Sequence, residues 1–246
     1  MMNMFYKWRN AYKKKDPYFA YIHCDEMHGS SSLFDLCSED ESFIDLQLKK
    51  VSLFCDNLKK NYRGNLGYDL ALINLDNQIE RIVNKIDTDE KYKDTILVIT
   101  SDHGCSSNYN PLRPKLQHFY DEAYHIPFIV YGKDIEPKID NDFHISKDIM
   151  ATFAELCGFE KPKHTTGISI FSSEKRKYVN QEYMGKGCPD LYRRPILMCA
   201  FDDNWKVYIK SYINKDKFEY KNLKIINIKE IRYHAQVTIR RSRARV

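Results

Sequence analysis

The stretch DTILVITSDHGCSS, residues 94–107, decides the fold of this chain. Residues 95–101 carry no charge, as in a buried strand, and an acid, an imidazole and a glycine follow directly. In open α/β sheets, ligands gather outside the carboxyl ends of the strands. Asp102 and His103 therefore stand where a binding site is expected, and Gly104 lets the backbone turn without a Cβ clash.

Asp102 and His103 have the chemistry of metal ligands. A carboxylate oxygen beside an imidazole nitrogen suits Zn²⁺ or Mn²⁺, whereas carboxylate oxygens alone would suffice for Ca²⁺. The same residues also fit a simple turn, in which Asp102 is the cap and His103 is an ordinary loop residue. Taken alone, the motif leaves both interpretations open.

Helix and strand patterns alternate on both sides of this stretch. The predicted elements are strands over 17–24, 95–101 and 126–132, and helices over about 41–60, 66–86 and 146–156. Ser146 is expected to cap the last of these helices and Gly158 to end it. Three strands with helices between them predict an α/β fold with a mainly parallel sheet flanked by helices.

The last third of the chain has a different pattern. Two strand-like runs, RPILMCAF and WKVYIKSY, flank Asp202, Asp203 and Asn204, which is typical of an antiparallel hairpin. We therefore expect a small C-terminal antiparallel β region. The predicted organisation is an N-terminal extension over 1–16, an α/β domain over 17–171, an antiparallel subdomain over 172–230 and a basic tail over 231–246.

Composition and charge argue against several classes of protein. The 246 residues contain no apolar run of 18, so no membrane span is expected, and the start lacks the apolar core of a signal peptide. A cytoplasmic location is the default expectation. The net charge of +5 comes from basic residues at the two ends, so no nucleic-acid partner is predicted. Seven cysteines without a CxxC pair indicate neither a disulfide framework nor a zinc knuckle, and we expect most to be buried thiols.

Six ordered segments resemble the sulfatase family within the alkaline-phosphatase-like superfamily. They are YFAYIHCDEMHG, GYDLALINLDNQIERIV, TILVITSDHG, FYDEAYHIPFIVYG, ISKDIMATFAELCG and TGISIF, and they span about residues 17–171. The resemblance implies a partial alkaline-phosphatase-like fold. It also implies that Asp102 and His103 bind the catalytic divalent metal and that His28 contacts the sulfate or phosphate ester.

Two more residues are candidates for this site. Many sulfatases place a lysine four residues before the aromatic of the segment FYDE, and here Leu116 holds that position with Lys115 one residue away. His118 precedes Tyr120 by two residues and could face the pocket or the surface. His28, Lys115 and His118 are therefore the predicted catalytic residues.

The resemblance implies metal-dependent hydrolysis of sulfate esters, with sulfated carbohydrates as one substrate class. Family members also use two carboxylates near the chain start and a nucleophile in a Cys/Ser-x-Pro-x-Arg motif, neither of which is found in this sequence. Whether this chain is itself an enzyme is therefore left open. The alternatives are a phosphoethanolamine or phosphoglycerol transferase, a phosphodiesterase, or a non-catalytic protein that keeps the fold. The expected partner is a sulfated or phosphorylated small molecule or glycan.

Overall fold

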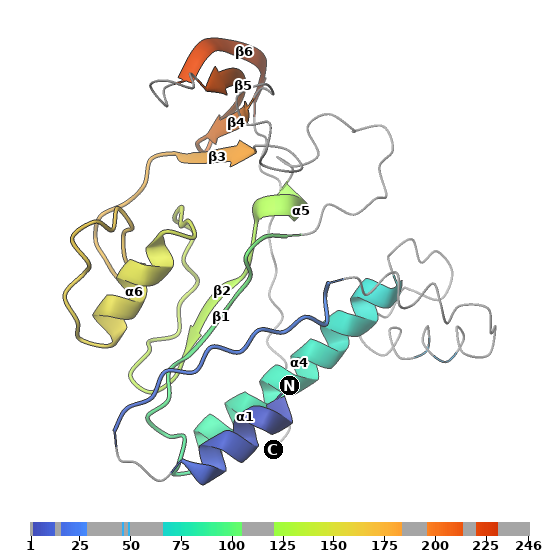
Figure 1. Cartoon of the computed structure of the whole chain (residues 1–246), viewed down its shortest axis with the longest axis vertical. Helices are drawn as coiled ribbons and strands as arrows, with labels where there is room; N and C mark the ends of the chain where they lie inside the picture. The colour runs from blue at the N-terminus through green and yellow to red at the C-terminus, as the bar shows by residue number, and fades with distance from the viewer. Residues whose placement is uncertain are drawn as a thin grey trace. The chain divides into compact units, whose positions relative to one another are not determined.

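The computed structural model describes residues 2–12, 16–28, 46, 49, 66–104, 121–183, 196–213 and 220–230. The chain divides into two compact units, whose helices and strands are labelled in Figure 1. Unit 1 comprises Met1–Ile99 and Phe128–Ile135, and unit 2 comprises Thr100–Pro127 and Glu136–Val246.

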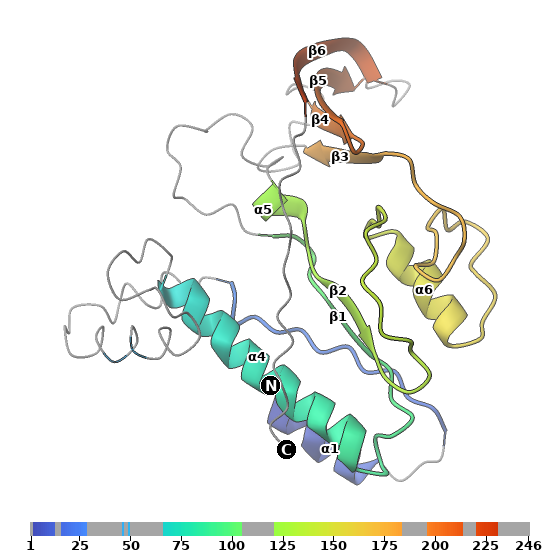
Figure 2. The ribbon, with the colours of Figure 1, turned by 180° about the vertical axis from the view of Figure 1, so that it is seen from behind.

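Unit 1 contains the long helix predicted from apolar spacing, α4 at Leu66–Thr88. Asp69 in its first turn and Lys85 in its last turn complement the helix dipole. A second helix, α1 at Met2–Ala11, lies beside α4 in both ribbon views (Figures 1 and 2). The Lys85 ammonium lies 5.2 Å from the centre of the Tyr6 ring and so connects the two helices.

Residues 17–24 have no regular secondary structure, so the strand predicted there is wrong. The aromatic residues that suggested a strand make side-chain contacts instead. The Tyr18 ring centre lies 4.8 Å from the Arg9 guanidinium, and the Tyr18 hydroxyl lies 3.1 Å from Thr95 Oγ1. A cation over an aromatic face contributes about 0.5–2 kcal/mol. These side-chain contacts connect the segment to α1 and to Thr95, just before β1.

Two of the three predicted strands are present. β1 at Leu97–Thr100 and β2 at Phe128–Tyr131 pair in a two-stranded sheet. Most of their side chains are half-buried. The uncharged, β-branched and aromatic composition of these runs was therefore sufficient to predict both strands.

β1 and β2 run antiparallel, which corrects the expectation of a mainly parallel sheet. Past the end of β1, the Gly104 amide donates a hydrogen bond of 2.9 Å to the Ala123 carbonyl, which precedes β2. At the other end, a Cβ at Gly132 would lie 2.7 Å from the Thr95 carbonyl oxygen. Parallel strands need a crossover that returns the chain to the opposite edge. Here the chain re-enters the sheet beside the point where it left.

In unit 2, α6 at Asp148–Leu156 confirms the helix predicted before Gly158. Gly158 has a φ of +69°, the left-handed conformation in which many helices end. The predicted Ser146 cap is wrong, because the residue at the cap position is Lys147 and no side chain caps the helix there. Asp148 in the first turn supplies the negative charge that favours a helix start.

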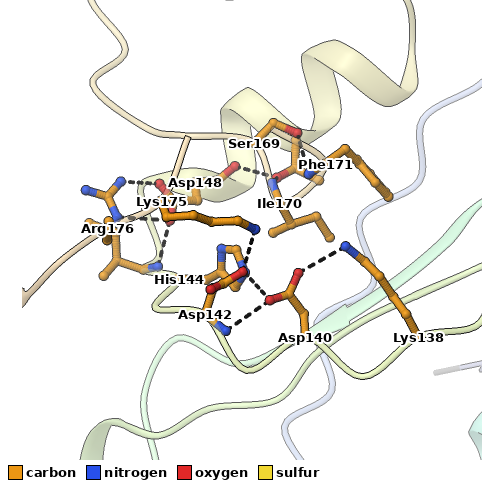
Figure 3. A network of polar contacts seen from close by, with 12 residues as sticks. Lys138, Asp140, Asp142, His144, Asp148, Ser169, Ile170, Phe171, Lys175 and Arg176 are labelled. Atoms are coloured by element: carbon orange, nitrogen blue, oxygen red, sulfur yellow. Dashed lines mark hydrogen bonds and ion pairs between the residues drawn. The ribbon is translucent and has the colours of Figure 1, made fainter. Parts of the chain in front are cut away.

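Asp148 is the centre of a polar network in unit 2 (Figure 3). Its side chain is almost fully buried, accepts hydrogen bonds from the Ile145 amide at 2.8 Å and the Ile168 amide at 2.7 Å, and pairs with Arg176. More exposed ion pairs surround it, at Lys138–Asp140, His144–Asp140 and Lys175–Asp142. Asp148 therefore joins the segments before and after α6 to the helix.

The predicted C-terminal antiparallel region is confirmed. Four antiparallel strands form one sheet in sequence order: β3 at Val179–Tyr183, β4 at Ile196–Phe201, β5 at Trp205–Ile213 and β6 at Tyr220–Glu230. The turn between β4 and β5 is the predicted one. Asp202 Oδ1 accepts the amides of Asn204 at 2.8 Å and Trp205 at 2.7 Å, as in an Asx turn.

The core of this sheet contains a buried cysteine. Cys199 packs with Phe201 and Tyr208, and desolvation raises the pKa of its thiol to about 11. Cys24 is half-buried and Cys157 is exposed, and all three thiols are free. The expectation of mostly buried thiols therefore holds for one of the three described cysteines.

Other predictions fall outside the described residues or stay predictions. The helix over about 41–60 is described only at residues 46 and 49, and the basic tail over 231–246 is not described. The domain boundary near residue 172 stays a prediction. In the part of the chain that the structure describes, no helix has the length and apolar character to cross a bilayer.

We expect Asp148→Ala to lower the free energy of unfolding by about 3–5 kcal/mol, because it leaves the Arg176 charge and two partly buried amides without this acceptor. Asp142→Ala in the same network is the control. Its pair with Lys175 is partly exposed, and such pairs contribute about 0–1 kcal/mol. Urea denaturation followed by circular dichroism measures both, and equal effects would contradict the central role of Asp148.

Candidate metal site

The Asp-His-Gly turn lies directly after β1, in unit 2. Asp102 and His103 follow Ser101, and their side chains are 80% and 72% exposed. The strand ends at Thr100, so the turn occupies the position that the sequence predicted for it. Both side chains are accessible to a ligand from solvent.

The two side chains converge. His103 Nε2 lies 3.6 Å from Asp102 Oδ2. His103 Nδ1 lies 2.6 Å from the Gly104 carbonyl oxygen, and since a carbonyl can only accept, Nδ1 carries the proton of the neutral ring. The lone pair of Nε2 then faces a carboxylate oxygen. Two acceptors that face each other are stabilised by a cation or a proton between them.

The second oxygen of Asp102 anchors the carboxylate in the turn. Oδ1 accepts the His103 amide at 2.9 Å and the Ser101 hydroxyl at 3.4 Å. Desolvation acts to raise the pKa of this carboxyl, but the hydrogen bonds from the His103 amide and the Ser101 hydroxyl outweigh it. The pKa of Asp102 is therefore lowered from its ordinary value. The carboxylate is an anion over the physiological pH range.

This donor pair fits a divalent metal ion. Metal–nitrogen and metal–oxygen bonds to Zn²⁺ are about 2.0–2.2 Å long, so atoms 3.6 Å apart can both reach one ion. A metal-binding histidine commonly donates its other ring N–H to a carbonyl, which His103 does. Over the described ranges, no cluster of three or more His, Cys, Asp or Glu side chains is arranged to hold a metal. Among the described residues, the candidate donors at this turn are therefore Asp102 and His103 alone.

Gly104 is required by close approach of backbone to backbone. A Cβ at this position would lie 2.2 Å from the Glu122 carbonyl oxygen, in the helix α5 at Asp121–Tyr124. The Gly104 amide also donates to the Ala123 carbonyl at 2.9 Å. The Asp-His-Gly turn thus lies directly against α5.

The other predicted site residues are His28, Lys115 and His118. His28 is exposed in a turn, its amide donates to the Asp25 carbonyl at 3.1 Å, and it belongs to unit 1. Lys115 and His118 lie outside the described residues. The role of all three stays a prediction. Ser101, which the sequence did not single out, orients the turn by donating to the His103 carbonyl at 2.7 Å.

Comparison with known proteins identifies the family. A family model described as Sulfatase matches residues 1–159. The chain belongs to the sulfatase family. Asp102, His103 and His28 all lie within the matched sulfatase region, and members of this family generally depend on a divalent metal ion.

Individual sulfatases match shorter parts of this chain. The arylsulfatase of Hemicentrotus pulcherrimus is 30% identical over 155 residues, which cover 60% of this chain and 24% of that protein. The delta 4,5-hexuronate-2-O-sulfatase of Bacteroides thetaiotaomicron is 28% identical over 117 residues, covering 43% and 24%. The crystal structure of a putative sulfatase from the same bacterium aligns with a TM-score of 0.49 at 19% identity, covering 65% of this chain and 35% of that chain. The match extends over about a quarter of the length of the two curated relatives.

We expect Gly104→Ala to lower the free energy of unfolding by about 1–3 kcal/mol, because the added methyl group must displace the Glu122 carbonyl. Gly158→Ala is the control. Its Cβ would meet no atom within 4 Å, so its cost of about 1–2 kcal/mol comes from the left-handed backbone alone. Urea denaturation measures both, and the amide spectrum should change at Ala123 only in Gly104→Ala. An unchanged Ala123 signal in that variant would contradict the close approach.

Proposed function

We propose that Asp102 and His103 hold a divalent metal ion and that the protein hydrolyses sulfate esters. The observation that carries the proposal is the approach of His103 Nε2 to Asp102 Oδ2 at 3.6 Å, with the histidine proton held on the other nitrogen. Membership of the sulfatase family supports the reaction type.

Asp102 and His103 would contribute to holding the ion in different ways. Asp102 supplies negative charge and stays ionised because its pKa is lowered. The bond from His103 to the Gly104 carbonyl keeps the Nε2 lone pair available. When bound, the ion would activate a coordinated nucleophile and neutralise charge on the ester oxygens. A mixed oxygen and nitrogen pair favours Mn²⁺ or Zn²⁺, and Ca²⁺, for which carboxylate oxygens alone would suffice, is the alternative.

We further propose that the substrate is a sulfated carbohydrate. A relative named for a hexuronate 2-O-sulfate, 28% identical over 117 residues, supports this class. His28, Lys115 and His118 are proposed to contact the sulfate group, since each can be a cation or a hydrogen-bond donor to an anionic oxygen.

Metal binding is tested with Mn²⁺ as the probe. We expect Asp102→Asn and His103→Gln each to weaken Mn²⁺ binding by about tenfold or more, since losing even an outer-shell partner of a metal ligand costs 10–100-fold. Titration followed by electron paramagnetic resonance of free Mn²⁺ measures the affinity. Asp94→Asn is the control, because Asp94 is an exposed carboxylate paired with Lys133 in unit 1. Equal affinities in all four proteins, or no binding by the wild type, would refute the proposed ligands.

The reaction is tested with an aryl sulfate and the matching aryl phosphate in the presence of Mn²⁺, Zn²⁺ or Ca²⁺. We expect the sulfate ester to be cleaved faster. We expect the activity to be lost on chelation, which removes the metal, and to be lowered in Asp102→Asn, which weakens metal binding. Faster cleavage of the phosphate would favour the transferase or phosphodiesterase alternative. Metal binding with neither ester cleaved would favour a non-catalytic role.

A further inference from the structure

Lys206 is a buried cation on β5, in the antiparallel sheet of unit 2. The residue is 7% exposed, and lysine is almost never buried unless it is paired. Its ammonium donates to the Tyr124 hydroxyl at 2.7 Å and lies 3.4 Å from Asp121 Oδ1. It also lies 4.5 Å from the centre of the Tyr124 ring and 5.3 Å from that of Phe201. The sheet therefore places a desolvated charge against α5.

Two polar partners of Lys206, Asp121 and Tyr124, are the first and last residues of α5. The Tyr124 hydroxyl donates to the Asp121 carboxylate, and the Tyr124 ring packs at 5.4 Å from the Phe201 ring. A helix of four residues is too short to be stable by itself. The position of α5 therefore depends on these contacts with β4 and β5.

α5 in turn positions the metal-binding turn. The Ala123 carbonyl accepts the Gly104 amide at 2.9 Å, and the Glu122 carbonyl leaves no room for a Cβ at Gly104. The Gly104 carbonyl then accepts the proton of His103 Nδ1 at 2.6 Å. Each of these contacts lies within unit 2. Continuous contacts thus lead from Lys206 through α5 to the histidine that is proposed to bind the metal.

We propose that Lys206 is a positioning residue for the metal site. It holds α5 against the antiparallel sheet, and α5 holds Gly104, His103 and thereby the spacing between His103 and Asp102. The consequence for metal affinity rests on the proposed function, whereas the coupling between Lys206 and Gly104 does not. Lys206 lies 82 positions from Tyr124 in the sequence and outside the matched sulfatase region of residues 1–159.

The coupling is tested by Lys206→Met, which keeps the aliphatic stem and removes the charge. Asp121 is 62% exposed, so its carboxylate remains solvated in this variant. We expect hydrogen exchange at the Gly104 amide, measured by NMR on the full chain, to be about tenfold faster, as follows from losing one charge-assisted hydrogen bond. We expect Mn²⁺ affinity to fall by about threefold to tenfold for the same reason.

Two further variants separate positioning from general stability. Lys206→Arg keeps a cation and should restore both the Gly104 exchange rate and the Mn²⁺ affinity to within about threefold of the wild type. Lys210→Met makes the same substitution on β5, where the ammonium lies over the Tyr212 ring, and should leave both readouts unchanged. Exchange at the Cys157 amide, which donates to Phe153 in α6, reports general loosening and should not change.

The outcomes distinguish the two proposals. Faster exchange at Gly104 in Lys206→Met, with the Cys157 amide unchanged, supports the positioning role even if the wild type binds no Mn²⁺. Absence of Mn²⁺ binding by the wild type refutes the metal site alone. An unchanged Gly104 exchange rate in a folded Lys206→Met variant, or equal acceleration at Gly104 and Cys157, overturns the positioning role.

Discussion

The hydrogen bond from the Gly104 amide to the Ala123 carbonyl is the contact on which the candidate site depends. It connects the turn after β1 to the short helix before β2. Only glycine fits at position 104, because a Cβ there would collide with the Glu122 carbonyl oxygen. Because both partners are backbone groups, the bond places the turn without using the side chains of Asp102 and His103. Those side chains remain exposed and directed toward each other.

Asp148 and Lys206 are buried charges of unit 2 that are stabilised in different ways. Asp148 is surrounded by donors, with two backbone amides and the Arg176 guanidinium. Lys206 lies among aromatic rings, a phenol hydroxyl and one carboxylate. A buried charge is costly unless it is paired and hydrogen-bonded, so each makes the surrounding packing specific. Asp148 fixes the segments around α6, and Lys206 fixes α5.

The sulfatase family match and the geometry of the Asp102–His103 turn support different conclusions. The family match extends over residues 1–159 and supports the proposed class of reaction. The convergence of Asp102 and His103, and the tautomer that the Gly104 carbonyl selects, concern how this chain can hold a cation. The antiparallel sheet lies beyond the matched region, and its Lys206 contacts α5 next to the turn. A segment outside the family match therefore contributes to the environment of a residue within it.

Features that depend on neighbouring residues were predictable from the sequence alone. The apolar spacing of α4, the uncharged run of β1, the glycine that ends α6 and the Asx turn at Asp202 are all local. The adjacency of Asp102 and His103 is local too, but adjacent side chains can point apart, so only the structure shows their approach to 3.6 Å. The strand predicted over 17–24 is wrong, because a strand needs a neighbouring strand to pair with, and the local pattern does not specify one.

The direction of β2 relative to β1 was likewise decided by where the chain re-enters the sheet. The tertiary structure alone decided that Lys206 contacts Asp121, 85 positions away. It also decided that Gly104 is needed for close approach to α5. Contacts between residues so far apart in the sequence form only if packing the side chains and pairing the buried charges together lower the free energy of the folded chain. That total free energy cannot be read from any short stretch of sequence.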